Sequence, residues 1–262
     1  MLLQRIISAL VGVPLIVLAV WQAGIPLLLL TGIIVFLGLR EMSEMLSRLG
    51  IKPSFWLAQA GGLILLGGAY LYHDGYPGPT ITIILFLELI AIVAFYPRYS
   101  LLDIAGTLMG TLYVGLMCYF YLISTLPDGG TWLIFMFACT WASDTFAFFI
   151  GKAFGRKRIA PVISPKKTLE GASGGLLGSV IIAYLFGIVY PFLPLPKLLL
   201  LGFMLGIAAG VGDLLESAFK RQAGLKDSSA LIPGHGGILD RFDSALFTAP
   251  LVYYFVRLFI IG

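Results

Sequence analysis

The sequence is poor in charge: only 11% of its 262 residues are Asp, Glu, Lys or Arg, whereas 59% are hydrophobic. About a quarter of the residues of an ordinary soluble domain are charged, so the composition excludes that class of protein. The mean hydropathy is +0.99, and several apolar runs approach the roughly twenty residues that a helix needs to cross a bilayer. The sequence therefore predicts an integral membrane protein.

Cysteine and histidine are scarce as well, with two of each. Both cysteines fall inside apolar runs, so neither a disulfide framework nor a Cys/His metal site is expected. The apolar runs show little alternation of polar and apolar residues, which excludes barrel strands and leaves helices to satisfy the backbone. There is no P-loop and no internal repeat of the kind found in many transporters. We expect an all-α, polytopic bundle.

The apolar runs predict about nine transmembrane helices, separated by turns rich in Pro, Gly and Asp. They cover residues 6–20, 25–39, 55–72, 80–95, 101–124, 131–150, 171–190, 197–212 or slightly beyond, and 244–261.

Lys and Arg are distributed unevenly between the two ends of these spans. With a cytoplasmic N-terminus, all 17 of them lie on the cytoplasmic side except Lys197, which lies outside, and Arg257, which lies inside the last span. This bias predicts that the N-terminus is cytoplasmic and the C-terminus is outside. The net charge of +4 then reflects topology and contact with anionic headgroups, and no nucleic-acid partner is expected.

Polar residues are concentrated in the second half of the chain. We therefore divide the sequence into an N-terminal hydrophobic helical region, residues 1–100, and a C-terminal catalytic membrane domain, residues 101–262, with cytoplasmic loops at 151–170 and 213–243. The glycine-rich seventh and eighth spans favour close helix packing. The same glycines would also be compatible with a homodimer.

Acidic side chains inside apolar helices are the first candidates for a site, because each costs about 2.5–3.5 kcal/mol on insertion and needs a partner or a role. Asp144 lies near the cytoplasmic end of the sixth span. Asp213 begins a polar helix face with i, i+3, i+4 and i+7 spacing, continued by Glu216, Ser217 and Lys220. Such a face is either a binding site or a self-neutralising ion cluster.

Two more carboxylates, Asp240 and Asp243, stand three residues apart at the start of the last span. Helix capping explains a carboxylate in a first turn, which accounts for Asp243 alone. Because the eighth span ends and the ninth begins on one side of the membrane, we expect both residues at the depth of Asp213. Carboxylate oxygens from different helices suit Mg²⁺. The number of cations stays open, with a second cation as one option.

Basic and glycine-rich segments complete the pattern. Lys166 and Lys167 follow the rigid Pro165 in "SPKKT", so their amines can be fixed beside the carboxylates, where they would bind a polyphosphate. Positive-inside charge is the simpler explanation for the rest of that loop. In "PGHGG", His235 either fills a tight turn or lies in a backbone nest that approaches phosphate.

The segment from Ser217 to Asp243, "SAFKRQAGLKDSSALIPGHGGILDRFD", resembles the signature of the phosphatidate cytidylyltransferase family, also called CDP-diacylglycerol synthases. Every fixed element is present at its expected spacing: a Ser, Lys-Arg, Lys-Asp, Pro-x-His-Gly-Gly and Asp-Arg-x-Asp. "SDTFAFFIGK" and "SPKKTLEG" resemble further blocks of the same enzymes. The resemblance covers residue 131 to the end, whereas the first hundred residues match only in being hydrophobic.

The resemblance implies a Mg²⁺-dependent transfer of the CMP moiety of CTP to phosphatidate, giving CDP-diacylglycerol and pyrophosphate. The lipid phosphate is already an anionic nucleophile, so the protein only has to align two polyanions and stabilise the leaving group. We assign the first metal ligands to Asp213 and Asp240, with Asp144 and Asp243 as additional ligands. Substrate phosphates would be neutralised by Lys166, Lys167, Lys220, Arg221 and Arg241. Substrate would also contact Ser164, Ser217, Lys226, Asp227, Gly234, His235, Gly236 and Gly237.

The alternative functions are a lipid kinase and a transporter. A CTP-dependent kinase of a polyprenol-type lipid would need a base to deprotonate a hydroxyl and would release CDP. An anion transporter would place its charged residues near the midplane, whereas here they cluster toward one side. We expect an enzyme of the bacterial cytoplasmic membrane whose active site faces the cytoplasm and whose lipid substrate enters from the bilayer.

Overall fold

The computed structural model describes residues 2–73, 77–191, 193–232, 234 and 236–262. The chain forms two compact units. Unit 1 contains Met1–Thr125 together with Phe219–Arg241, and unit 2 contains Leu126–Ala218 together with Phe242–Gly262. The boundary at residue 125 differs from the predicted division at residue 100 because the helices after residue 100 continue to pack on the amino-terminal ones.

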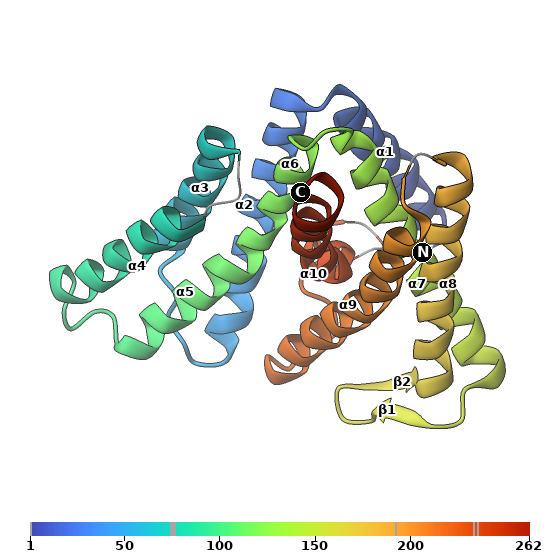
Figure 1. Cartoon of the computed structure of the whole chain (residues 1–262). Coiled ribbons are helices and arrows are strands. Elements are labelled where there is room, and N and C mark those ends of the chain that lie inside the picture. The colour runs from blue at the N-terminus through green and yellow to red at the C-terminus, as the bar shows by residue number, and fades with distance from the viewer. Residues whose placement is uncertain (1, 74–76, 192, 233, 235) are drawn as a thin grey trace. The chain divides into compact units, whose positions relative to one another are not determined.

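The described part of the chain is almost entirely helical (Figure 1). The elements, in order, are α1 Leu2–Gln22, α2 Gly24–Arg48, α3 Phe55–Tyr72, α4 Pro77–Ala94, α5 Leu101–Gly115, the 3₁₀ turn η1 Leu116–Cys118, α6 Tyr119–Ser124, α7 Gly129–Phe154, β1 Arg158–Ala160, β2 Ser164–Thr168, α8 Leu169–Val189, α9 Leu195–Gln222, α10 Leu239–Phe255 and the π-helical turn η2 Val256–Ile261.

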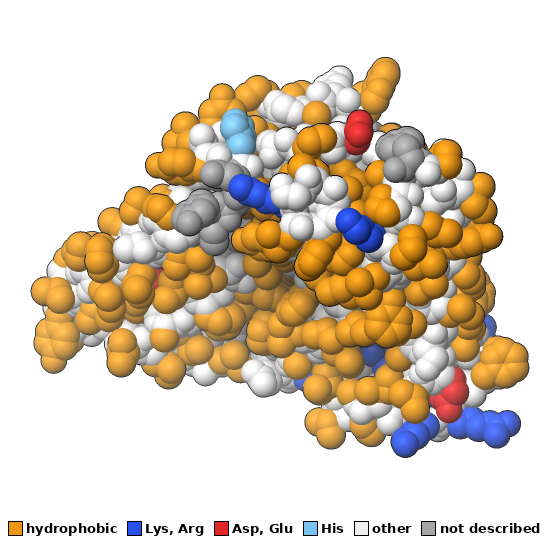
Figure 2. All heavy atoms as spheres, viewed as in Figure 1, with side chains coloured by type: hydrophobic (Ala, Val, Ile, Leu, Met, Phe, Trp, Pro, Cys, Tyr) orange, Lys and Arg blue, Asp and Glu red, His pale blue; other side chains and the backbone are white. Residues whose placement is uncertain are grey.

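Seven helical segments in the described residues are long and apolar enough to cross a membrane, and Gly78–Ala94 is a shorter apolar helix. Apolar side chains also cover most of the face shown in Figure 2. These features confirm the all-α integral membrane protein. Each of the nine predicted spans coincides with a helical segment in position, whereas nine membrane crossings and their orientation stay predictions.

Three helical boundaries differ from the predicted ones. Helix α2 continues nine residues past Leu39 to Arg48. Helix α9 continues past the apolar run to Gln222, which includes the helical face expected from Asp213 to Lys220. Helix α10 begins at Leu239, so the described non-helical residues of the predicted loop 213–243 all lie between Gln222 and Leu239. Hydropathy alone ended α2 and α9 too early and began α10 too late, because a polar helical turn keeps its backbone hydrogen bonds outside the apolar run.

Unit 1 is built around α2, α3 and α5, which contact one another. Asp103 fastens the start of α5 to the preceding helices, since it completes a capping box with Ser100 and accepts from the Lys52 amide at 2.6 Å. The last turn of α9 belongs to the same unit: the ring of Phe219 packs edge-on against Tyr113 of α5 at 5.3 Å between centroids.

Unit 2 is held together by close helix contacts at glycines. A Cβ on Gly175 of α8 would lie 2.9 Å from the Ser143 carbonyl of α7, and a Cβ on Gly202 of α9 would lie 2.5 Å from Ala183 of α8. This confirms the packing role expected of the glycine-rich spans. The homodimer stays a prediction.

A two-stranded antiparallel hairpin, β1–β2, replaces the irregular loop expected between α7 and α8. The Glu170 carboxylate in the first turn of α8 accepts from the backbone amides of Arg156 and Lys157 at 3.0–3.3 Å. Thr168 caps α8 through the Gly171 amide at 3.1 Å. The hairpin is therefore fastened to α8 at its base, which gives Lys166 and Lys167 a regular backbone.

Candidate active site

The signature segment folds back on itself between α9 and α10. Helix α9 ends at Gln222, and Gly224 continues in the left-handed region at φ +68°. The Arg221 guanidinium donates to the Leu225 carbonyl at 3.0 Å, which satisfies a main-chain group just after the helix. A second tight turn is closed by the Ile232 amide, which donates to the Gly236 carbonyl at 2.8 Å.

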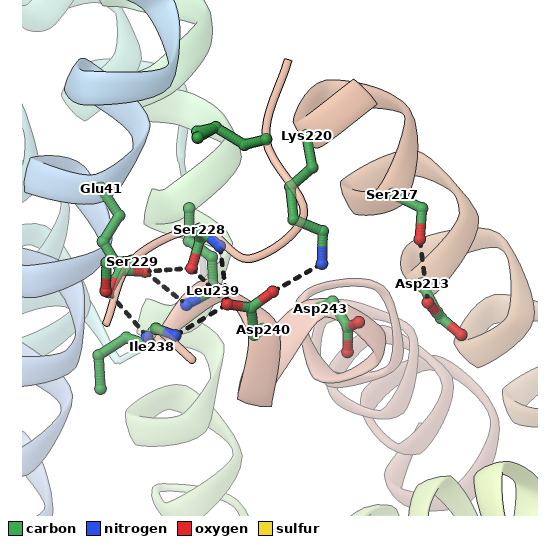
Figure 3. Close-up of polar contacts among 12 residues, drawn as sticks. Glu41, Asp213, Ser217, Lys220, Ser228, Ser229, Ile238, Leu239, Asp240 and Asp243 are labelled. Atoms are coloured by element: carbon green, nitrogen blue, oxygen red, sulfur yellow. Dashed lines mark hydrogen bonds and ion pairs between the residues drawn. The ribbon is translucent and has the colours of Figure 1, made fainter. Parts of the chain in front are cut away.

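Asp240 is the best-connected carboxylate of the signature (Figure 3). Its Oδ1 accepts from Lys220 Nζ at 2.6 Å, and both side chains are largely buried. Its Oδ2 accepts from the Ser228 amide, the Ser228 hydroxyl and the Gly237 amide, each at 2.8 Å. Lys220 and Asp240, both predicted site residues, are thus brought together in unit 1.

A second buried carboxylate, Glu41 of α2, was not singled out from the sequence. Its Oε1 accepts from the Ser229 hydroxyl at 2.6 Å and the Ile238 amide at 2.9 Å. Its Oε2 accepts from the Ser228 hydroxyl and the Leu239 amide, both at 2.9 Å. Only 3% of Glu41 is exposed. Figure 3 shows it facing the signature loop and the start of α10.

The two carboxylates explain two glycines of the signature. A Cβ on Gly237 would lie 2.1 Å from the Ser228 hydroxyl oxygen and 2.4 and 2.5 Å from the oxygens of Glu41. Gly236 has φ +81°, and a Cβ on it would lie 2.5 Å from Asp240 Oδ2. These glycines therefore make room for the protein's own carboxylates. The predicted approach of their backbone to substrate phosphate stays a prediction.

Unit 2 holds the other pair of predicted residues. Lys167 Nζ of β2 lies 2.7 Å from Asp213 Oδ2 of α9, with side chains about one quarter and one third exposed. Ser217 donates to the other oxygen of Asp213 at 3.4 Å. Adjacent residues of a strand point to opposite faces, and Lys166 is accordingly exposed while Lys167 is directed at the helix.

Helices α9 and α10 touch near Asp213. A Cβ on Gly212 would lie 2.5 Å from the Asp243 carbonyl oxygen and 3.1 Å from Ser244 Cα. The Asp243 side chain is half-buried and accepts from the Ser244 amide at 2.6 Å. The backbones that carry Asp213 and Asp243 are therefore neighbours within unit 2, whereas the shared depth expected of Asp213, Asp240 and Asp243 stays a prediction.

The remaining predicted residues are more open. Exposed positions are Asp144, Arg221, Lys226, Asp227, Gly234 and Arg241, whereas Ser164 is half-buried. His235 lies outside the described residues. Charged groups with room around them are suited to binding soluble anions, but their predicted roles stay predictions.

The described residues contain no group of three or more His, Cys, Asp or Glu side chains arranged to hold a metal ion. Mg²⁺ in nucleotide-using proteins is usually bound by one or two carboxylates together with substrate phosphates. The carboxylate donors of Asp213 and Asp243, on neighbouring stretches of backbone in unit 2, fit that kind of site.

The signal for Glu41 was present in the sequence. Buried residues at the end of α2 recur with helical spacing: Glu41, Met42, Met45 and Leu46. No site residue was expected in "REMSEMLSR", which contains four charged residues and follows the apolar run of residues 25–39. Continuing the 3.6-residue period beyond the apolar run would have placed Glu41 on the buried face.

Known proteins resemble the chain over nearly its whole length. The cytidylyltransferase family matches residues 3–259. A phosphatidate cytidylyltransferase of Synechocystis sp. is 37% identical across 97% of this chain and 96% of its own length. Proteins of the same name from Staphylococcus saprophyticus and Staphylococcus aureus are 34% and 35% identical, with 95% of both chains covered in each case. The chain belongs to the cytidylyltransferase family.

Proposed function

We propose that this protein transfers the CMP moiety of CTP to phosphatidate, giving CDP-diacylglycerol and pyrophosphate for phospholipid synthesis. The family match and the relatives named phosphatidate cytidylyltransferase support a nucleotidyltransferase that acts within a membrane. The observation that carries the proposal is the folding of the signature segment: its buried lysine and carboxylate, Lys220 and Asp240, are paired at 2.6 Å and held by main-chain donors.

The reaction needs alignment more than it needs a base. A phosphatidate oxygen attacks the α-phosphorus of CTP, a new P–O bond forms, and the bond to the β-phosphate oxygen breaks to release pyrophosphate. Because the attacking oxygen is already anionic, no side chain has to remove its proton. The protein contributes by holding polyanions together and by offsetting charge on the leaving group.

Basic side chains supply that charge. Lys167 is fixed at the end of β2 by its ion pair with Asp213, so its amine is already oriented and needs little ordering when substrate binds. Lys166, Arg221, Lys226 and Arg241 are exposed and would bind phosphate oxygens as mobile or charge-assisted donors. We also assign substrate contacts to Ser164, Ser217, Asp227, Gly234, His235, Gly236 and Gly237.

We further propose that the enzyme uses Mg²⁺, with Asp213 and Asp240 as first ligands and Asp144 and Asp243 as additional ones. These carboxylates would hold the ion, which would supply positive charge to offset that of the leaving pyrophosphate. The positive-inside bias supports placing the active site on the cytoplasmic side of the bacterial inner membrane. CTP would then arrive from the cytoplasm, and phosphatidate from the bilayer.

Purified protein incubated with CTP, phosphatidate and Mg²⁺ should yield CDP-lipid and pyrophosphate in equal amounts, and EDTA should stop the reaction. Asp213→Asn should lower turnover at least about tenfold, since it removes a proposed ligand and the partner of Lys167. Asp128→Asn is the matched control, because Asp128 is exposed and asparagine tolerates its left-handed backbone. Equal turnover in the two variants would contradict the ligand assignment.

The same assay separates the other functions. A lipid kinase would release CDP in place of pyrophosphate, and a transporter would give no CDP-lipid. The family match does not favour either.

A further inference from the structure

We propose that Glu41 is a positioning residue for the active site, which holds the signature loop and the start of α10 so that Asp240 keeps its place. The inference rests on the proposed function and gives the amino-terminal helices a part in it. It is carried by contacts inside unit 1, where α2 and residues 219–241 belong to one compact body.

Glu41 is surrounded by donors from the signature segment and from the start of α10. Four donors surround one carboxylate: two hydroxyls of the loop, from Ser228 and Ser229, and two amides, from Ile238 and Leu239. All four distances fall between 2.6 and 2.9 Å. The Ser228 hydroxyl has one proton and also lies against Asp240 Oδ2, so Glu41 keeps three donors of its own and shares the fourth. The Glu41 oxygens therefore hold the loop and the start of α10.

The two amides that donate to Glu41 lie at the start of α10. Leu239 is the first residue of α10, and Ile238 directly precedes it. The first amides of a helix have no partner within the helix, and a negative charge next to them is stabilised by the helix dipole. Glu41 thus caps α10 from another helix, at a sequence distance of nearly two hundred residues.

The Ser228 side chain links Glu41 to Asp240. The Ser228 hydroxyl lies 2.9 Å from Glu41 Oε2 and 2.8 Å from Asp240 Oδ2, so it touches both carboxylates. Asp240 follows the capped residue Leu239 directly, and Gly237 touches both carboxylates as well. A change at Glu41 therefore reaches Asp240 through the backbone of α10 and through the Ser228 side chain.

There is no space for a side chain at Gly237. With a Cβ at this position, the nearest atoms would be the Ser228 hydroxyl and both oxygens of Glu41, all within 2.5 Å. The carboxylate therefore fits directly against the bare backbone of the loop. This contact gives a physical reason for a glycine at this position that involves α2 and no ligand.

The proposal is tested with Glu41→Gln, Glu41→Asp and the matched control Glu44→Gln. Glu44 lies on the same helix one turn away, is exposed, and is paired only with Arg48 at 3.4 Å. The amide of Gln at position 41 would place a donor against backbone donors, and Asp would keep the charge but shorten the reach. Two readouts are taken: kcat and KM with CTP and phosphatidate, and hydrogen exchange of the amides of residues 228–239.

We expect Glu41→Gln to lower kcat by about tenfold or more, as changes to groups that orient a site residue usually do. The KM for phosphatidate should change little, and exchange should rise at Ile238 and Leu239 but not in α3. Glu41→Asp should recover part of kcat, which a merely structural loss of folded protein would not show. Glu44→Gln should match the parent in both readouts.

Parental kcat and parental exchange in Glu41→Gln would overturn the proposal, as would a fall in kcat with unchanged exchange of the loop. If Glu41→Gln fails to fold, Ser229→Ala is measured in its place, because it removes one donor to Glu41 from a half-buried position. The kinetic constants and the hydrogen exchange of residues 228–239 are then measured in Ser229→Ala, with the same outcomes for and against the proposal. If the parent and Glu44→Gln make no CDP-lipid, the proposed function fails, while the exchange data still test the contact itself.

Discussion

Adding one methyl group at Gly237 should disable the site without altering any charge. In Gly237→Ala the new Cβ would lie 2.1–2.5 Å from the Ser228 hydroxyl and from both oxygens of Glu41, well inside the distance that real Cβ atoms show. These neighbours are held by hydrogen bonds, so relief requires the loop to move. We expect a cost of about 1–3 kcal/mol from overpacking, plus about 1.5–3 kcal/mol for each charged hydrogen bond that breaks.

The result is measured as turnover and as hydrogen exchange of the signature loop. Since a loss of about 3 kcal/mol of local stability raises the open population roughly a hundredfold, exchange of the loop amides should accelerate by a similar factor. Gly210→Ala is the control, because Gly210 lies on the same helix as Lys220. A Cβ at position 210 would meet nothing within 4 Å. It should leave turnover near the parental level. Parental turnover and exchange in Gly237→Ala would refute the account of this glycine.

Three further outcomes follow from single contacts. Lys220→Met should destabilise unit 1 by about 3–5 kcal/mol in detergent-based thermal unfolding, because it leaves the buried Asp240 without its cation; an unchanged melting temperature would contradict this. Lys167→Met should cost little stability, since its pair with Asp213 is partly exposed, yet lower turnover about tenfold; unchanged turnover would remove Lys167 from the site. Glu170→Ala should make the β1–β2 hairpin more sensitive to trypsin, because the amides of Arg156 and Lys157 at its base lose their acceptor; equal cleavage in parent and variant would show that other contacts hold it.

Composition and hydropathy were sufficient to predict the fold class. Long apolar segments leave the helix as the only way to satisfy the backbone, so the positions of the helical segments followed from the sequence. What they did not reveal was where polar helical turns continue. Hydropathy is blind to the extension of α2 to Arg48 and of α9 to Gln222, because those turns are stabilised by packing and not by the bilayer.

The site was predictable where the chemistry is local and unpredictable where it is not. The signature marked Lys220 and Asp240, and the structure pairs them. Glu41 is separated from its partners by nearly two hundred residues, and no periodicity within one sequence reports such a contact. The glycines illustrate the same limit. "HGG" suggested either a tight turn or a backbone that approaches phosphate, and the structure shows that the groups next to Gly236 and Gly237 include the protein's own carboxylates.

The most direct test of the central claim follows the label of CTP. Protein in detergent is given phosphatidate, Mg²⁺ and CTP labelled either at the α- or at the γ-phosphorus. The account predicts that α-label enters the lipid and that γ-label is recovered only in pyrophosphate. Label from the γ-position in the lipid, or no labelled lipid with any divalent cation, would contradict it.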